Sequence, residues 1–219
     1  GGRIILMASR ALAQVARGPD DYAKVYGRIL SQLREPTIIH WHGQIPPIAQ
    51  DGVPGAPLPM LQPGGIRDFD FAPQTGTHWM HAHVPHQEMQ LLAAPLIVRS
   101  TDDLRADRQE VVVMLHDFSF TPLAEHLVRL GGSAAGHAVH HGAAPAAMSA
   151  AMDLNDIDFD AYLANDRTLA DPQVIAVEPG GRVLLRVING AAATVFWIDT
   201  GHLRSALVAV DGKPIQEAL

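Results

Sequence analysis

The sequence contains two His-x-His pairs, His40-Trp41-His42 and His81-Ala82-His83. Residues i and i+2 of a β-strand point to the same face of a sheet, so each pair on a strand would present two imidazoles side by side. Imidazole suits copper, zinc, nickel and iron, whereas oxygen-rich sites select magnesium or calcium. A single pair arises easily by chance on a protein surface. Two pairs on strand-like segments of one small domain predict a shared transition-metal site.

The segments around the pairs have the composition of strands. Residues 37–42 are β-branched and aromatic and are followed by Gly43, which is typical of a strand that ends in a turn. Residues 66–71 alternate apolar and charged side chains, as a half-buried strand does. Further strands are expected at 77–84 and 94–98, and the charged stretch 101–110 is expected to be a linker.

The second half of the chain continues the same pattern. Strands are expected at 111–115, 174–177, 182–188, 194–198 and 205–210, with a short helix at 122–130. Residues 131–152 are Gly, Ala, His and Met with little else, which predicts a mobile loop. At the start of the chain, a short amphipathic helix fits residues 4–16 better than an export signal, because Arg10 interrupts the apolar run. The sequence therefore predicts two β-sandwich units, the second of them unfinished.

Composition excludes several classes of protein. The net charge of −7 argues against a nucleic-acid partner, because phosphate backbones are bound by clustered Lys and Arg. No apolar run approaches the roughly 18–20 residues that span a bilayer, so no membrane span is expected. The chain has no cysteine, which excludes disulfides and thiolate metal sites. Sixteen prolines and nineteen glycines fit an all-β plan with many turns better than a helical bundle.

Three motifs carry a resemblance to a known family. They are Glu35-Pro36-Thr37-Ile38-Ile39-His40-Trp41-His42-Gly43, Asp51-Gly52-Val53-Pro54-Gly55 and Gly76-Thr77-His78-Trp79-Met80-His81-Ala82-His83. Together they resemble the first cupredoxin-like domain of multicopper oxidases, the group of laccases and bacterial copper-resistance oxidases. Residues 111–120 and 174–214 resemble the second domain. The resemblance implies cupredoxin-like Greek-key β-sandwiches, the first over residues 1–103 and a partial second over 104–219.

The resemblance also implies a role for each motif residue. His40 is expected to bind the type 2 copper of a trinuclear cluster, and His42 one type 3 copper. His81 and His83 are expected to bind one copper each of the type 3 pair. Asp51 stands where the family keeps an acidic residue, which implies that it orients water near the type 2 copper and assists proton delivery. A plain turn residue before Gly52 is the alternative.

The remaining histidines receive other interpretations. His78 would face away from His81 on a strand, so packing or a supporting hydrogen bond is expected. His86 is expected to support a loop, and His116 to be structural. Five residues of the 131–152 loop form either an accessory copper site or part of a solvated loop, the latter being favoured. They are His137, His140, His141, Met148 and Met152.

The chain departs from the family in ligand number. A type 1 copper needs a cysteine thiolate, and this sequence contains none. A trinuclear cluster takes four His-x-His motifs, of which two are present. Residues 1–33 do not resemble the family's first strands, so the chain is expected to be incomplete at both ends. The missing ligands are expected from a C-terminal cupredoxin domain or a second subunit.

The expected function of the parent protein is copper-dependent oxidation of a substrate, coupled to reduction of dioxygen to water. The chain alone is expected to be inactive. Its expected partners are dioxygen and a reducing substrate, and its expected location is the periplasm or the cell exterior. Two alternatives remain open: a copper-binding or copper-tolerance protein without turnover, and a non-catalytic scaffold of the same fold.

Overall fold

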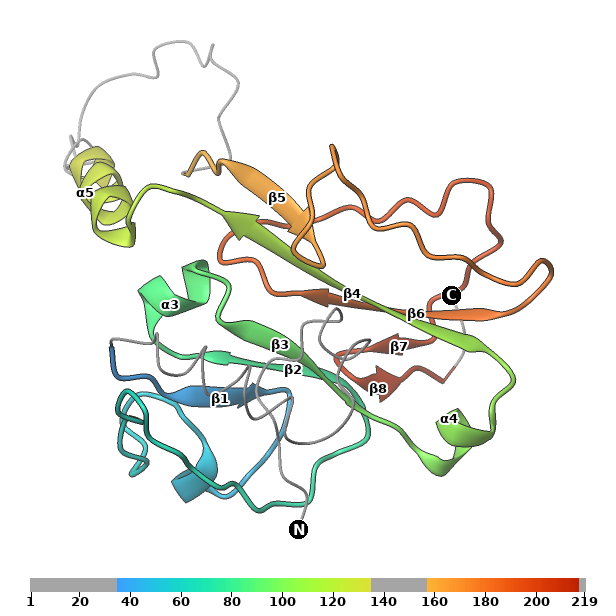
Figure 1. Ribbon diagram of the computed structural model, residues 1–219, viewed down its shortest axis with the longest axis horizontal. Helices are drawn as coiled ribbons and strands as arrows, with labels where there is room; N and C mark the ends of the chain where they lie inside the picture. The colour runs from blue at the N-terminus through green and yellow to red at the C-terminus, as the bar shows by residue number, and fades with distance from the viewer. Residues whose placement is uncertain (1–34, 135–156, 217–219) are drawn as a thin grey trace, which may run out of the picture.

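The computed structural model describes residues 35–134 and 157–216, except for the side chains of 131–134. In this part the chain is mostly β-strand, with short helices between the strands (Figure 1). The elements are β1 (Ile39–His42), η1 (Ile48–Gln50), β2 (Gly76–Ala82), α3 (Pro85–Met89), β3 (Ala93–Val98), α4 (Thr101–Arg105), β4 (Gln109–Phe118), α5 (Leu123–Ala134), β5 (Ala161–Ala164), β6 (Val183–Asn189), β7 (Ala209–Val210) and β8 (Lys213–Pro214). None of these helices is long and apolar enough to cross a bilayer.

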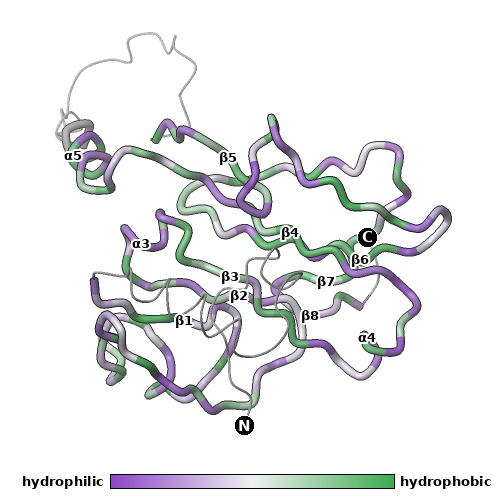
Figure 2. Tube along the Cα trace, in the orientation of Figure 1, coloured by the Kyte–Doolittle hydropathy of each residue, from purple (hydrophilic) through white to green (hydrophobic). Residues whose placement is uncertain are grey.

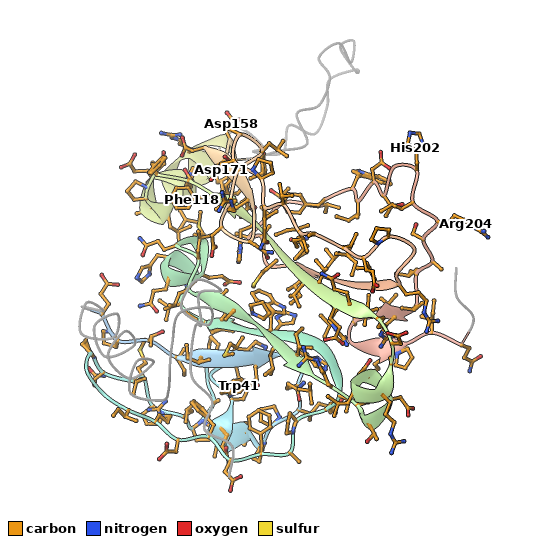
Figure 3. All side chains as sticks on the ribbon, turned by 45° about the vertical axis from the view of Figure 1, so that its right-hand side comes forward. Trp41, Phe118, Asp158, Asp171, His202 and Arg204 are labelled. Carbon is orange, nitrogen blue, oxygen red and sulfur yellow. The ribbon has the colours of Figure 1, made fainter. Side chains whose placement is uncertain are left out.

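The first sheet has the order β1-β2-β3 and is antiparallel throughout. One face of it is covered by a small core around Trp41, whose side chain is fully buried. Ile39, Met80 and Ala94 pack in this core, and the Trp41 indole donates a hydrogen bond to the Gln50 carbonyl at 3.0 Å. Trp41, a residue of β1, is labelled in Figure 3. Alternation along β1 therefore directs the indole into the core and the two flanking histidines to the other face.

The strand predicted at 66–71 is wrong, although the segment still contributes to the core. Phe69 and Phe71 pack edge-on against Trp41, at ring distances of 4.9 and 5.4 Å. The Gln50 side chain donates to the Asp70 carbonyl at 2.8 Å and accepts from the Asp70 amide at 2.6 Å. A side-chain amide thus satisfies the backbone groups that a neighbouring strand would otherwise pair. The alternating pattern indicated the partial burial of Phe69 and Phe71, but Ile66 is 88% exposed and the segment pairs with no strand in the described part of the chain.

The second sheet has the order β5-β4-β6, with β4 parallel to β6 and antiparallel to β5. Figure 2 shows hydrophobic residues along β4 and β6. Asn165, just after β5, adopts a positive φ of 51°. Its side chain accepts from the Met114 amide and donates to the Val112 carbonyl, so it extends the ladder along β4. An apolar cavity of about 570 Å³ lies on this sheet, and Val113, Tyr162 and Trp197 are among the residues that line it.

Several predicted elements of this half differ from the structure. Residues 174–177 and 194–198 form no strand, and only Ala209–Val210 of the segment 205–210 does. Near 194 the backbone amides of Ala192, Ala193 and Thr194 donate to the Asp117 carboxylate instead of to a strand. The expected linker at 101–110 contains α4, because Ser100 and Asp103 form a reciprocal capping box at its start.

The two sheets are joined by a buried guanidinium. Arg186 on β6 donates to Thr77 Oγ1 of β2 at 2.9 Å and to Glu110 Oε1 of β4 at 2.7 Å. Its side chain is 8% exposed, and Asp103 lies 3.4 Å from it. Two carboxylates therefore neutralise a charge that would otherwise be costly to bury. This network fixes the second sheet against the strand that carries His81.

Candidate metal centre

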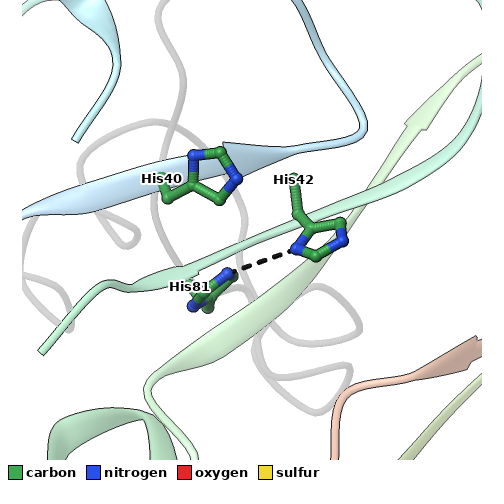
Figure 4. A group of neighbouring side chains, drawn as sticks. All are labelled: His40, His42 and His81. Atoms are coloured by element: carbon green, nitrogen blue, oxygen red, sulfur yellow. Dashed lines mark hydrogen bonds between the residues drawn. The ribbon is translucent and has the colours of Figure 1, made fainter. Parts of the chain in front are cut away.

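The four motif histidines lie on one face at the edge of the first sheet. His40 and His81 are direct partners in the β1–β2 ladder, and His83 continues the pairing through a hydrogen bond from its amide to the Ile38 carbonyl at 2.8 Å. The His40 ring lies 5.4–5.5 Å, centre to centre, from each of the other three. One ligand atom from each of His40, His42 and His81 can be chosen so that all three lie within 4.8 Å of one another (Figure 4). The two pairs lie together as predicted, and His40, His42 and His81 form a group that could share one metal ion, whereas His83 lies beside this group and is not part of it.

The four histidines of the cluster differ in how deeply they are buried. His81 is buried, His40 and His83 are half-buried, and His42 is exposed. Trp79, the β2 partner of His42, stacks on the His42 ring at 4.8 Å and on the His81 ring at 4.4 Å. The indole therefore forms an apolar wall against both rings. The cluster opens to solvent on the side of His42.

Asp51 holds His40 in one orientation. Its Oδ1 lies 2.7 Å from His40 Nδ1 and accepts a longer hydrogen bond of 3.4 Å from the Trp41 amide. A carboxylate acceptor at Nδ1 fixes the proton there, so Nε2 carries the lone pair for a metal. The position of Asp51 is set by Gly52, whose amide donates to the Ile39 carbonyl at 2.9 Å. A Cβ at residue 52 would lie 2.1 Å from that carbonyl oxygen, so only glycine fits this contact.

His42 and His81 turn nitrogen atoms toward each other. His42 Nδ1 lies 3.4 Å from His81 Nε2, and His81 Nδ1 donates to the Ala82 carbonyl at 3.0 Å. Burial lowers the pKa of His81 to about 4, and it also lowers the pKa of His42. The neighbouring imidazoles act in the same direction on both groups. Both rings are therefore neutral at pH 7, as a histidine must be to bind a metal.

Sequence reasoning missed one acidic residue at the cluster. Glu88, on α3, places Oε1 3.4 Å from His81 Nδ1. Burial raises the pKa of this carboxyl, while the charges of His83 and His40 act to lower it. The available signal was Pro85, which starts a helical turn directly after the second pair. Such a turn folds the chain back over the strand it has just left.

The sequence and its fold are similar to known copper proteins. A family model described as "Protein of unknown function (DUF993)" matches residues 1–54. Copper resistance protein A from Pseudomonas syringae pv. tomato is 30% identical over 212 residues, covering 85% of this chain and 35% of that protein. Copper resistance protein A from Escherichia coli is 30% identical over 213 residues, with the same coverage. The chain thus spans about a third of the length of the curated relatives it matches.

Solved structures agree with these relatives. A multi-copper oxidase from Pseudomonas thermotolerans superposes with a TM-score of 0.62 at 25% identity, covering 85% of this chain and 42% of that one. The blue copper oxidase from Nitrosomonas europaea has the same fold over 85% of this chain and 54% of its own, with a TM-score of 0.57 at 24% identity. The chain belongs to the multicopper oxidase family. The expected all-β, cupredoxin-like fold is confirmed over the matched part.

The donor set of this multicopper oxidase chain fits copper. The cluster offers imidazole nitrogens, the ligand type that suits copper, and hydrogen bonds to His40 Nδ1 and His81 Nδ1 leave Nε2 of each ring for a metal. His42 differs, since it turns Nδ1 toward His81. The residues that line the apolar cavity on the second sheet include neither a motif histidine nor Asp51. The histidine cluster is therefore the stronger candidate for copper chemistry.

The other histidines lie apart from the proposed ligands. His78 is buried against the backbone of Gly43. A Cβ at residue 43 would lie 2.7 Å from His78 Nδ1, so the His78 ring fills the space that a side chain there would need. His86 contacts Glu35 at 2.5 Å on the surface. His116 is buried on β4, and neither of its ring nitrogens has a hydrogen-bond partner among the described residues. The candidate accessory site at His137, His140, His141, Met148 and Met152 lies outside the described residues.

Proposed function

We propose that this chain supplies half of the histidine ligands of a trinuclear copper cluster. His40 would bind the type 2 copper, and His42, His81 and His83 the type 3 pair. The observation that carries the proposal is the convergence of both pairs on one face, with a carboxylate on His40 Nδ1. Bound copper would supply the electron transfer by which a reducing substrate is oxidised and dioxygen is reduced to water.

The chain's own residues would prepare the site. Asp51 would hold His40 and, from the same place, orient water and assist proton delivery during reduction of dioxygen. Trp79 would keep water from one side of the His42 and His81 rings. The exposure of His42 supports a partner there, since further ligands must reach the coppers from outside this chain. That partner would be a C-terminal cupredoxin domain or a second subunit.

We propose a first cupredoxin-like domain at 1–103 and a partial second one at 104–219. A periplasmic or secreted location is proposed from the family resemblance. Dioxygen and a reducing substrate are the proposed small-molecule partners.

A copper-binding protein without turnover is the second candidate. It is favoured by the absence of cysteine, because a type 1 copper needs a thiolate to receive electrons from substrate. The relatives from Pseudomonas syringae and Escherichia coli are both named copper resistance protein A. A copper-free scaffold is less favoured, because all four motif histidines are present and converge.

Copper titration of the purified chain tests the proposal. The dissociation constant for Cu(II) would be measured by competition with a chromogenic chelator. We expect His42→Ala to weaken binding at least about tenfold, since it removes a direct ligand. His202→Ala is the matched control, because His202 is exposed and points away from the molecule (Figure 3). Equal affinity of wild type and His42→Ala would contradict the proposal.

A further inference from the structure

A second carboxylate lies at the histidine cluster: Asp51 contacts His40 of β1, and Glu88 on α3 lies beside His81 of β2. The turn of α3 brings Glu88 back to β2, where Oε1 lies 3.4 Å from His81 Nδ1. The Glu88 side chain is 29% exposed, so the contact is partly shielded from water. The neighbouring Gln87 is buried and donates to the Pro36 carbonyl at 3.0 Å, which anchors α3 to the segment before β1. The place of Glu88 is therefore set by the fold.

Among the described residues, His81 Nδ1 has one hydrogen-bond acceptor, the Ala82 carbonyl, and one carboxylate close beside it, that of Glu88. The Ala82 carbonyl lies at 3.0 Å and the Glu88 carboxylate at 3.4 Å. Both favour a proton on Nδ1, which leaves Nε2 facing His42 Nδ1. The carbonyl orients the ring and keeps the proton on Nδ1. The carboxylate adds a negative charge beside the same nitrogen. A carboxylate behind a histidine raises the basicity of the ligand nitrogen and fixes its direction.

We propose that Glu88 is a positioning residue for copper: it holds His81 with Nε2 toward the shared metal position and places a compensating charge beside the ions. The inference rests on the proposed function, which assigns no role to Glu88. Glu88 would then be the counterpart of Asp51, because His40 and His81 are ladder partners and each has a carboxylate near Nδ1.

Two variants separate the charge of Glu88 from its polarity. Glu88→Gln keeps a polar oxygen and loses the charge, while Glu88→Leu loses both. Glu125→Gln on the exposed part of α5 is the matched control. In the competition titration of the full chain with Cu(II), we expect about tenfold weaker binding for Glu88→Gln and up to about a hundredfold for Glu88→Leu. Circular dichroism of the copper-free variants checks that each is folded.

A second measurement does not depend on copper. Imidazole ¹⁵N spectra of the copper-free chain report which His81 nitrogen carries the proton. We expect the Nδ1–H form in wild type, and a smaller share of it in Glu88→Leu, where only the Ala82 carbonyl still favours that form. Wild-type copper affinity in a folded Glu88→Leu chain would overturn the inference and leave the proposed function intact. Failure of the wild-type chain to bind copper would overturn the proposed function. In that case an unchanged His81 tautomer in Glu88→Leu would overturn the role of Glu88 as well.

Discussion

His40 and His81 face each other across the β1–β2 ladder, with ring centres 5.4 Å apart and ring planes at 85°. Antiparallel pairing fixes their separation before any metal arrives, because the backbone register places both residues on the same face. His42 and His83 extend this pair by one alternation on each strand. The copper ligands of the proposed site are thus arranged by strand pairing and by two outside acids.

The contact between Asp51 and His40 predicts a specific loss of copper affinity. Asp51→Asn would weaken the charge-assisted hydrogen bond to Nδ1 and let the amide present either a donor or an acceptor there. We expect Cu(II) affinity to fall about 10–100-fold, measured by chelator competition. Asp158→Asn, an exposed acid labelled in Figure 3, is the control and should bind as wild type does. Unchanged affinity in Asp51→Asn would show that Asp51 is a turn residue only.

Trp41 predicts a large effect on folding without a direct role in copper binding. Trp41→Ala removes the one fully buried large side chain of the described core, and such truncations cost about 3–5 kcal/mol. Urea unfolding of the copper-free chain measures the loss. Trp197 is 97% exposed, so Trp197→Ala should stay within about 0.5 kcal/mol of wild type. A similar loss in both variants would contradict the placement of Trp41 in the core.

The strands around the metal centre were predictable because two independent patterns coincide there. Alternation predicted the shared face of His40 and His42, and the β-branched and aromatic composition predicted the strand itself. Glu88 was not predictable in the same way, since its contact depends on how tightly the chain turns after Pro85. The strand prediction at 66–71 failed for a related reason. Phe69 and Phe71 do pack against the core, but the Gln50 side chain took the place of a paired strand. Similarly, local hydrophobicity near Thr194 gave no sign that the Asp117 carboxylate captures the backbone amides.

The isolated chain should show neither intense blue absorption nor oxidase turnover, even after copper loading. The charge-transfer band of a type 1 copper needs a thiolate, and the sequence has no cysteine. Visible absorption and oxygen consumption with a phenolic substrate measure the two properties. Copper-catalysed turnover by the pure chain, abolished in His42→Ala, would contradict this prediction.

Copper affinity should rise sharply when a C-terminal cupredoxin domain of the family is added. Each ion bound to this chain alone lacks ligands, and a partner that completes the coordination stabilises the bound state. Titrations with and without the added domain measure the gain. Equal affinity in both would favour the copper-binding protein without turnover.

His116 predicts a pH dependence of stability that is separate from copper. Burial lowers the pKa of His116, and the opposing charges of Asp166 and Asp117 are smaller effects. The folded state therefore binds the proton less readily than the unfolded chain, whose histidine has an ordinary value of 6.5. Above pH 6.5 His116 is neutral in both states and does not lower the free energy of unfolding. As the pH falls below 6.5, the unfolded chain takes up the proton first, so the free energy of unfolding decreases.

The variant His116→Leu isolates this contribution. The unfolding free energy would be measured in urea at about pH 7.5 and about pH 5.5, on either side of the ordinary histidine pKa. We expect the loss of stability on acidification to be smaller in His116→Leu than in wild type. His202→Leu, at an exposed position, should keep the wild-type pH dependence, and an equal slope in all three chains would refute the assignment to His116.

The contact of Gly52 with the Ile39 carbonyl links strand formation to ligand geometry. Asp51 is carried by backbone that is already ordered once β1 is paired, so the acid needs no loop rearrangement to reach His40. Most of the conformational entropy that ordering this part of the site requires is then lost during folding, not during metal capture. Copper would meet a rigid arrangement, and any residue larger than glycine at position 52 would transfer that entropic cost from folding to binding.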